Sequence, residues 1–397
     1  MNAPPVAPRL VSLDAFRGAT IAAMLLVNNP GSWSDIYAPL KHAEWHGWTF
    51  TDTVFPFFLW IVGVAIPLSF AKRLGQGARR SDLFRHVCLR AGVIFALGLF
   101  LNSFGTLIDG SLAKKGAGGW CADWAANVRI LGVLQRIALC YLAASAIYLT
   151  ARWRGQIAWA TGLLAGYWLL MRFVPVPGVG AGILDEKGNL SQWLDQLILG
   201  AHCYHGTKFY DPEGILSTLP AIATCLLGVL TGEWLRTDRP AGEKTAWLLV
   251  AGNLLLLTGA FMDLAFPINK KLWTSSFTVL MAGLAMNCFG VWYWLIDVQG
   301  WRAWARPFVV FGMNAIAMFV LAGVIGRLLI ELRVPGAEGK SLALKTWIWD
   351  HLFLTLTQGE TPWCSVKCAS LLYALGFVSL FFLIAWGMYR RKWFMKV

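Results

Sequence analysis

The chain has 397 residues, of which 57% are hydrophobic and 14% are charged, and its mean hydropathy is +0.57. A soluble domain does not have this composition, whereas a polytopic membrane protein does. In a soluble protein the net charge of +13 would point to nucleic acid. Here basic residues hold cytoplasmic loops against the membrane surface, so we expect lipid surroundings and no nucleic-acid partner.

Ten apolar runs are long enough to cross a bilayer, which takes about 20 residues. In chain order they lie near residues 10–28, 52–71, 84–104, 128–150, 156–174, 215–235, 245–265, 274–296, 307–329 and 368–389. No small-residue cleavage site follows the first run, so we expect it to be a retained span and not a signal peptide. The sequence therefore predicts an all-α protein of about ten transmembrane helices, with residues 1–397 forming a single transmembrane domain.

The loops between these runs alternate in charge. Short basic segments lie near residues 72–85, 152–154, 236–244, 302–306 and 390–396, and the intervening loops are longer and richer in Trp, Gly and acidic residues. The positive-inside rule then places both termini in the cytoplasm and the longer loops outside. In the outer loops, residues 189–200 have the apolar spacing of an amphipathic interfacial helix, and residues 347–356 suggest another such helix or a re-entrant piece.

The outer segment 41–58 carries two histidines and two carboxylates beside the membrane. His42 could act as a general base, or it could simply be a solvated interfacial histidine. Asp52 opens the second run, where it could cap a helix or support a catalytic imidazole. His46 would share a helical face with His42, but no third ligand has suitable spacing, so we expect no metal site.

Polar side chains inside the apolar runs are the next candidates, because they are costly there. Asn28 ends the first run, either as a helix stop or as an amide that binds an acyl oxygen. Arg17 and Arg136 lie deeper, and each could form a structural ion pair, such as Arg17 with Asp14, or bind a phosphorylated or carbonyl ligand. Arg129 could act in the same way.

Two later stretches, 211–220 and 267–276, open spans with several hydrogen-bonding groups. Ser275 belongs to the second stretch, and Asn314 lies inside the ninth run. An amide at such depth usually bonds to a neighbouring helix, yet both side chains remain candidates for ligand binding. The eight cysteines show no zinc spacing, and those in the outer loops leave disulfide pairing open. These outer cysteines are Cys121, Cys203, Cys364 and Cys368.

Taken together, these stretches resemble the heparan-alpha-glucosaminide N-acetyltransferase family and its bacterial relatives, within the wider transmembrane acyltransferases. The general base of that family falls on His42 and its active-site asparagine on Asn28. The matching pieces are LDAFRG (13–18), LLVNNPG (25–31), KHAEWHGWTFTDTVFPFFLWIVG (41–63), RILGVLQRIALCYL (129–142), DPEGILSTLPAIATCLLGVLTG (211–232), PINKKLWTSSF (267–277) and GMNAIAMF (312–319).

The resemblance implies an enzyme of the bacterial inner membrane that moves an acetyl group from cytoplasmic acetyl-CoA to the amine of an amino sugar or glycan on the periplasmic side. Asp52 would set the tautomer of the catalytic histidine. The expected donor-binding residues are Arg17, Arg136, Arg129, Asn314 and Ser275. The mechanism stays open between direct transfer and an acetyl-histidine intermediate. The oligomeric state stays open between a monomer and a homodimer. The alternatives are an amino-sugar transporter that uses the same polar cleft without chemistry, and a scaffold that only binds lipid.

Overall fold

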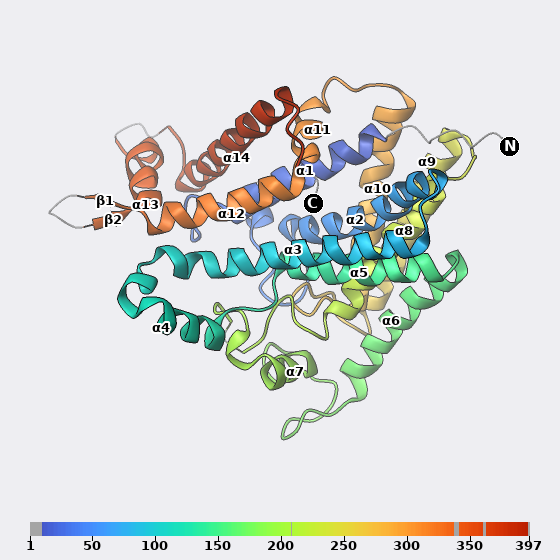
Figure 1. The fold of residues 1–397 in the computed structure, drawn as a ribbon, viewed down its shortest axis with the longest axis horizontal. Helices are drawn as coiled ribbons and strands as arrows, with labels where there is room; N and C mark the ends of the chain where they lie inside the picture. The colour runs from blue at the N-terminus through green and yellow to red at the C-terminus, as the bar shows by residue number, and fades with distance from the viewer. Residues whose placement is uncertain (1–9, 208, 337–340, 360–362, 396–397) are drawn as a thin grey trace.

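The computed structural model describes residues 10–207, 209–336, 341–359 and 363–395, and the chain there is almost wholly helical (Figure 1). The α-helices are α1 (Val11–Asn28), α2 (Phe50–Gly75), α3 (Arg80–Ile108), α4 (Ser111–Asn127), α5 (Val133–Thr150), α6 (Trp153–Phe173), α7 (Leu190–Ile198), α8 (Thr218–Leu235), α9 (Ala241–Asp263), α10 (Ser275–Tyr293), α11 (Arg306–Met313), α12 (Ala315–Glu331), α13 (Leu344–Ile348) and α14 (Val366–Arg390). The shorter elements are η1 (Ala38–Leu40), η2 (Gly200–His202), η3 (Trp294–Val298), η5 (Trp349–Phe353), η6 (Leu354–Thr357), β1 (Arg333–Pro335) and β2 (Ser341–Ala343).

The predicted all-α polytopic membrane fold is confirmed. Among the described residues, eight helices are long and apolar enough to cross a membrane, and α11 with α12 forms a ninth such segment that is bent by 79°. Helix α6 has 21 residues and covers the remaining predicted run, but it does not meet the same apolar criterion. Each of the ten predicted runs is therefore helical, and α6 is the least typical of a span.

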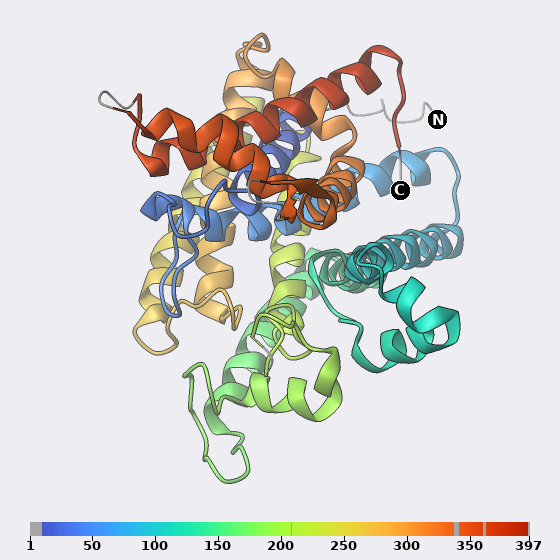
Figure 2. The same ribbon diagram turned by 90° about the vertical axis from the view of Figure 1, so that its left-hand side faces the viewer.

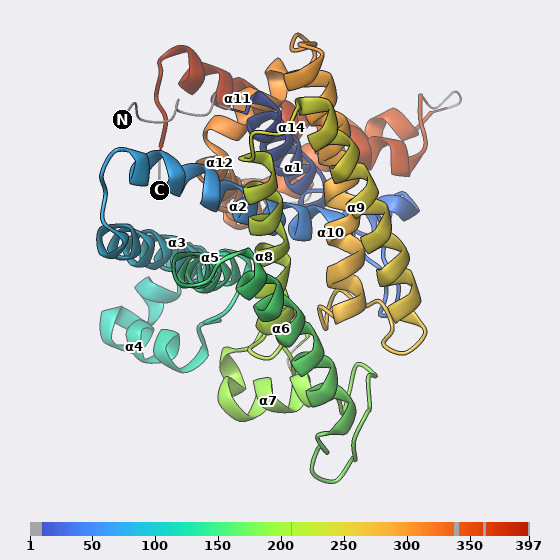
Figure 3. The ribbon, with the colours of Figure 1, turned by 90° about the vertical axis from the view of Figure 1, so that its right-hand side faces the viewer.

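Helices α2 and α8 pack against each other in the middle of the molecule, with α9 and α10 on one side and α3 and α5 on the other (Figure 3). Glycines bring their backbones together. A β-carbon on Gly63 would lie 1.9 Å from the carbonyl oxygen of Cys225, and one on Gly228 would lie 2.1 Å from that of Trp60. Small residues at such crossings allow the close approach that holds helices together in lipid.

Helix α1 contacts α11 in the same way, and this contact explains the glycine of the LDAFRG motif. A β-carbon on Gly18 would lie only 1.7 Å from the carbonyl oxygen of Phe308, and one on Gly312 would lie 1.9 Å from that of Asp14. Figure 2 shows the layer that results, with α11, α12 and α14 in orange and red across the top and the blue first helices beneath them. This packing anchors α1, whose C-terminal end reaches the candidate site.

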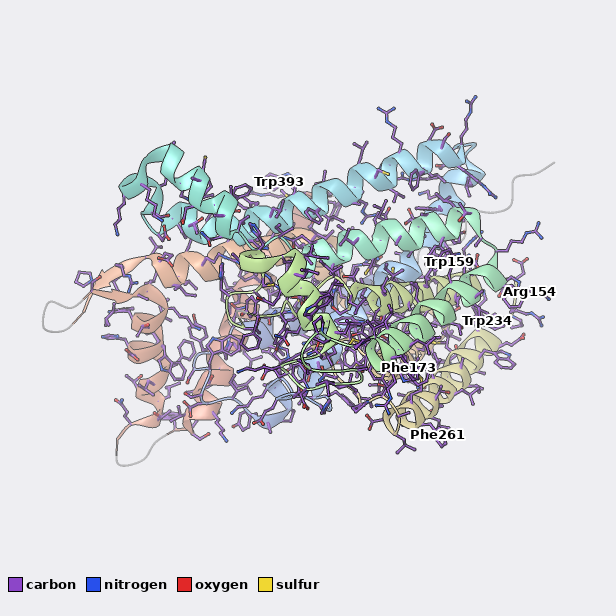
Figure 4. The ribbon with its side chains drawn as sticks, turned by 90° about the horizontal axis from the view of Figure 1, so that it is seen from below. Arg154, Trp159, Phe173, Trp234, Phe261 and Trp393 are labelled. Carbon is purple, nitrogen blue, oxygen red and sulfur yellow. The ribbon has the colours of Figure 1, made fainter. Side chains whose placement is uncertain are left out.

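The ends of the helices separate into two groups (Figure 1). The connections from α2 to α3 and from α5 to α6 lie at the right, whereas α4, α13 and the β1–β2 pair lie at the left. The first group carries the basic loops of the sequence. In Figure 4, Arg154 and Trp234 lie towards that basic end, while Phe173 and Phe261, which are 64% and 77% exposed, lie further along α6 and α9. Exposed apolar side chains of this size are expected where helices face lipid.

The segment 105–127 differs from the sequence prediction, which made it a loop, because it contains α4. Ala and Lys favour a helix there, and a break occurs at Gly116, whose φ of 65° suits glycine. Trp124 ties α4 back to α3 by donating to the Ser103 hydroxyl over 2.6 Å. The helix predicted at 189–200 is present as α7. Residues 347–356 cover the end of α13, the π-helical segment η5 and most of the 3-10 helix η6.

Candidate active site

A cavity of about 780 Å³ lies where the C-terminal end of α1 and the N-terminal ends of α2 and α5 meet the outer loops. Its volume is within the range of small-molecule binding sites. The residues that line it include Asn28, His42, Trp45, Asp52, Arg129, Glu186, Tyr204, Tyr210, Glu213, Lys270 and Trp273. The cavity thus brings together residues from segments that are far apart in the sequence, including the stretches 211–220 and 267–276.

His42 and Asp52 form the closest polar contact on this wall. His42 Nδ1 lies 2.6 Å from Asp52 Oδ1, with the Asp52 side chain 1% exposed and that of His42 46% exposed. A buried carboxylate at this distance accepts the Nδ1 proton and leaves the Nε2 lone pair free, which fixes the tautomer. The imidazole is therefore oriented by a buried carboxylate while its ring stays accessible from the cavity.

Asp52 also caps helix α2, so the two sequence interpretations of this residue are compatible. Its second oxygen, Oδ2, accepts from the main-chain nitrogens of Thr49 and Ala43, each over 3.0 Å. Thr49 and Asp52 form a capping box at the start of the helix. One oxygen therefore holds the loop and the helix together, and the other faces the histidine.

The loop that carries His42 is fastened to the loop between α9 and α10. The Gly47 nitrogen donates to the Ile268 carbonyl over 2.7 Å, and Lys271 Nζ donates to the Glu44 carbonyl over 2.6 Å. His46 Nδ1 lies 3.5 Å from the Asn269 side-chain amide, away from Asp52. The two histidines consequently occupy different environments, and His46 takes part in the contact between the loops.

Lys270 completes the polar group around Asp52. Its ammonium lies 3.2 Å from Asp52 Oδ1 and 3.1 Å from His42 Nδ1. Burial lowers the pKa of Lys270, and the Asp52 carboxylate opposes that shift. The sequence analysis had not assigned this residue a role. A signal for it exists, because two adjacent lysines in an outer loop run against the positive-inside rule.

Asn28 lies on the wall of the same cavity as His42, at the last position of α1. Its side chain makes no hydrogen bond with the other described residues within the distances that define one. The next residue, Asn29, uses its side chain to cap the helix by donating to the Leu25 carbonyl over 2.8 Å. Asn29 therefore caps the C-terminal end of α1, and the Asn28 amide remains available to a ligand.

Arg129 reaches the cavity but is held by two carboxylates. It donates to both oxygens of Asp211, over 2.8 and 2.6 Å, and to Glu213 over 2.6 Å. Burial alone would lower the pKa of Arg129, but the hydrogen bond and charge of Asp211 and the charge of Glu213 outweigh it and raise that pKa. The guanidinium also stacks on Tyr204, 4.6 Å from the ring centre.

Arg136 lies behind the cavity wall and is 1% exposed. It donates to the Gly214 carbonyl over 3.2 Å and to the Ser217 hydroxyl, and its guanidinium lies 5.1 Å from the ring centre of Trp273, which lines the cavity. Its Nε and Nη1 atoms are buried without a hydrogen-bond partner among the described residues. Arg136 thus supports the wall from behind.

The other three predicted donor-binding residues lie outside the cavity lining. Arg17 pairs with Asp14 over 3.2 Å on α1. Ser275 donates to the Leu164 carbonyl of α6 over 2.8 Å. Asn314 lies at the bend between α11 and α12, where its amide group bonds to the main chain of the C-terminal segment at Trp393 and Met395.

Aromatic side chains form the outer wall of the cavity, and the sequence analysis had not singled them out. Trp45 and Tyr210 meet edge to face with ring centres 5.9 Å apart. The Trp45 indole donates to the Leu184 carbonyl over 2.9 Å, and the Tyr210 hydroxyl donates to Glu186 over 3.3 Å. Such aromatic faces beside carboxylates are suited to a polar ligand that has an apolar face.

Comparison with known proteins identifies the family of this chain. Residues 9–259 match the family model described as heparan-alpha-glucosaminide N-acetyltransferase, catalytic. Two curated proteins named heparan-alpha-glucosaminide N-acetyltransferase are similar over 79% of this chain: that of Homo sapiens is 31% identical and that of Mus musculus 28% identical. The chain spans about half the length of these relatives, 52% and 53%. The matched residues include the whole His42–Asp52 loop, and the chain belongs to the heparan-alpha-glucosaminide N-acetyltransferase family.

Proposed function

We propose that this protein moves an acetyl group from cytoplasmic acetyl-CoA to the amine of an amino sugar or glycan on the periplasmic side of a bacterial inner membrane. The observation that carries the proposal is the pair of His42 and Asp52, 2.6 Å apart, on the wall of a cavity that also contains Asn28. Family membership supports the reaction class, and the alternation of basic loops supports the direction of transfer.

An acetyl thioester is already activated, so the remaining tasks are to position the reactants and to remove a proton from the amine. His42 Nε2 is the acceptor for that proton, because Asp52 holds the Nδ1 proton on the other side of the ring. The amine nitrogen attacks the thioester carbonyl, a C–N bond forms, and the C–S bond breaks. An acceptor that arrives as an ammonium first releases one proton to the solvent. The imidazole takes a second proton from the attacking amine and returns it to the departing CoA thiolate.

The carbonyl oxygen of the acetyl group gains negative charge during the attack and needs a donor. Asn28 is the proposed donor, because its amide lies on the same wall as His42 and the helix stop is made by its neighbour. Lys270 stabilises Asp52 as an anion, since its ammonium lies 3.2 Å from that carboxylate. The Asp52 carboxylate, 2.6 Å from the ring, favours a positively charged imidazole at the moment when the amine has lost its proton, whereas the Lys270 ammonium, 3.1 Å from Nδ1, opposes that charge.

The acceptor side of the cavity fits an amino sugar. Trp45 and Tyr210 offer ring faces for the apolar face of a pyranose, and Glu186 and Glu213 offer carboxylates for its ammonium and hydroxyl groups. Arg129 and Arg136 act as supports of this wall, through Glu213 and Trp273 respectively.

The test uses the purified full chain in lipid nanodiscs with radiolabelled acetyl-CoA. Glucosamine, cell-wall amino sugars and glucosamine-containing oligosaccharides serve as acceptors, and N-acetylglucosamine, which lacks a free amine, is the matched control. Labelled N-acetyl product from the free amines alone supports the proposal. Uptake of the sugars into sealed proteoliposomes without CoA, together with no labelled product, would instead establish the transporter.

A further inference from the structure

A cluster of basic side chains lies at the other end of the molecule, between α2, α3 and α5. Arg73 belongs to the last turn of α2, and His86 and Arg90 are one turn apart on α3. The charges of Arg73 and Arg90 disfavour a third positive charge on His86, so the cations of the cluster are the two arginines. The Arg90 guanidinium stacks over Tyr141 of α5, 5.1 Å from the ring centre, and Tyr141 also feels the charge of Arg73.

This cluster has no acidic partner, unlike Lys270 and Arg129 on the cavity wall. Lys270 pairs with Asp52, and Arg129 pairs with Asp211 and Glu213. Within the described part of the chain, no carboxylate lies within ion-pairing distance of the three clustered side chains. Like charges repel each other, so a group of this kind is stabilised by an anion from outside.

The Arg90 guanidinium can reach an anion only through its terminal nitrogens. Arg90 Nε is buried and inaccessible, whereas the two terminal nitrogens are not among the buried side-chain atoms of the described residues. The oxygens of a phosphate accept several hydrogen bonds from such donors, and the charge of a phosphate offsets those of Arg73 and Arg90.

We propose that Arg73, His86 and Arg90, together with Tyr141, form a phosphate-binding site on the cytoplasmic side of this protein. Two sources have this chemistry: the phosphates of the acetyl-CoA donor and the headgroup of an anionic lipid. The first of these sources rests on the proposed function. Along α3, Arg90 is twelve residues from Asn102, whose amide holds the main chain at Arg129 beside the cavity. This separation corresponds to roughly 18 Å of helix, so the two sites are distinct.

The experiment compares Arg73→Gln and Arg90→Gln with Arg85→Gln, an exposed change of equal charge on α3, in the full chain in nanodiscs. Binding of CoA, dephospho-CoA and pantetheine is measured by calorimetry in phosphatidylcholine. In parallel, the rise in melting temperature on adding phosphatidylglycerol is measured. Loss of a charge-assisted hydrogen bond should weaken binding about 10- to 100-fold.

Weaker CoA binding in the two cluster variants, with pantetheine binding and Arg85→Gln unchanged, assigns the site to the donor. Unchanged CoA binding with loss of the phosphatidylglycerol effect assigns it to lipid. If both responses match those of Arg85→Gln, the site is refuted. Absence of CoA binding in the wild type would count against the proposed donor, while the lipid measurement would still test the cluster. Arg73 lies at a helix end, so Arg73→Gln keeps the test valid if Arg90→Gln does not fold.

Discussion

Replacing Asp52 by Asn tests the proposed mechanism most directly, because the change keeps the shape of the side chain and removes its charge. The asparagine oxygen can still accept from the Thr49 and Ala43 nitrogens, so the cap of α2 is retained. The amide NH₂ would then face His42 Nδ1, where Oδ1 now lies at 2.6 Å. It would donate to Nδ1 and place the ring proton on Nε2, which is the wrong tautomer for a base.

The expected loss follows from that change of tautomer. A general base contributes about 10²–10⁴-fold in rate, and the equivalent change in a serine-protease triad costs about 10⁴-fold. We therefore expect kcat to fall by about 10²–10⁴-fold, which is about 3–5 kcal/mol of transition-state stabilisation. Because Asp52 does not contact the donor in this mechanism, the dissociation constant of acetyl-CoA should stay nearly unchanged.

The assay measures kcat with labelled acetyl-CoA and the best acceptor from the panel, and it measures donor binding by calorimetry on the same nanodisc samples. The melting temperature shows whether the cap of α2 has survived the change. A kcat within about threefold of wild type would refute the role of Asp52 in setting the tautomer. A normal kcat together with a lower melting temperature would leave Asp52 with a capping role alone.

Three further outcomes are expected. His42→Ala should lower kcat by about 10²–10⁴-fold in the same assay and leave acetyl-CoA binding intact, whereas His46→Ala should keep most of the activity because His46 bonds to the neighbouring loop. Gly18→Ala should lower the melting temperature, because its β-carbon would lie 1.7 Å from a carbonyl oxygen of α11, whereas Gly92→Ala, which has open space around it, should not. Asp195 is a buried residue of α7, and burial raises its pKa to about 6. The protonated carboxyl therefore favours the folded state at low pH, and this contribution to the free energy of unfolding is lost as pH rises through 6. The stability of Asp195→Asn relative to wild type should therefore increase by up to about 3 kcal/mol between pH 4 and 7, and a constant difference in melting temperature over that range would contradict this.

Much of the fold could be predicted because a membrane span is a local property of the sequence. Twenty apolar residues form a helix in lipid whatever their neighbours are, so each predicted run is helical. Which helices touch is a different matter. The glycines at positions 63 and 228 are informative only once α2 and α8 are known to cross there, since the same residue in a lipid-facing position signifies nothing. Helix α4 was missed because helix propensity in a polar loop is a weak signal.

The candidate site could be predicted in part for a similar reason. His42, Asp52 and Asn28 stand out because polar side chains are rare beside apolar runs, and the structure places all three on one cavity. The sequence left Asp52 as either a cap or a support for histidine, since each carboxylate oxygen can serve a separate purpose only in three dimensions. Trp45 and Tyr210 could not be found in this way, because aromatic residues are common at membrane interfaces and only their contact marks a wall.

The distribution of charge connects the two proposed sites. The cavity lining contains three carboxylates, Asp52, Glu186 and Glu213, and three cations, Arg129, Lys270 and Lys271. These described side chains are therefore balanced in charge, although the whole chain carries +13. A cavity without an excess of positive charge does not compensate the charge of several phosphates. A donor that combines a neutral acetyl thioester with several phosphates therefore matches the protein only if its phosphates stay at the cationic end. The unpaired cluster at Arg73 and Arg90 supplies that end.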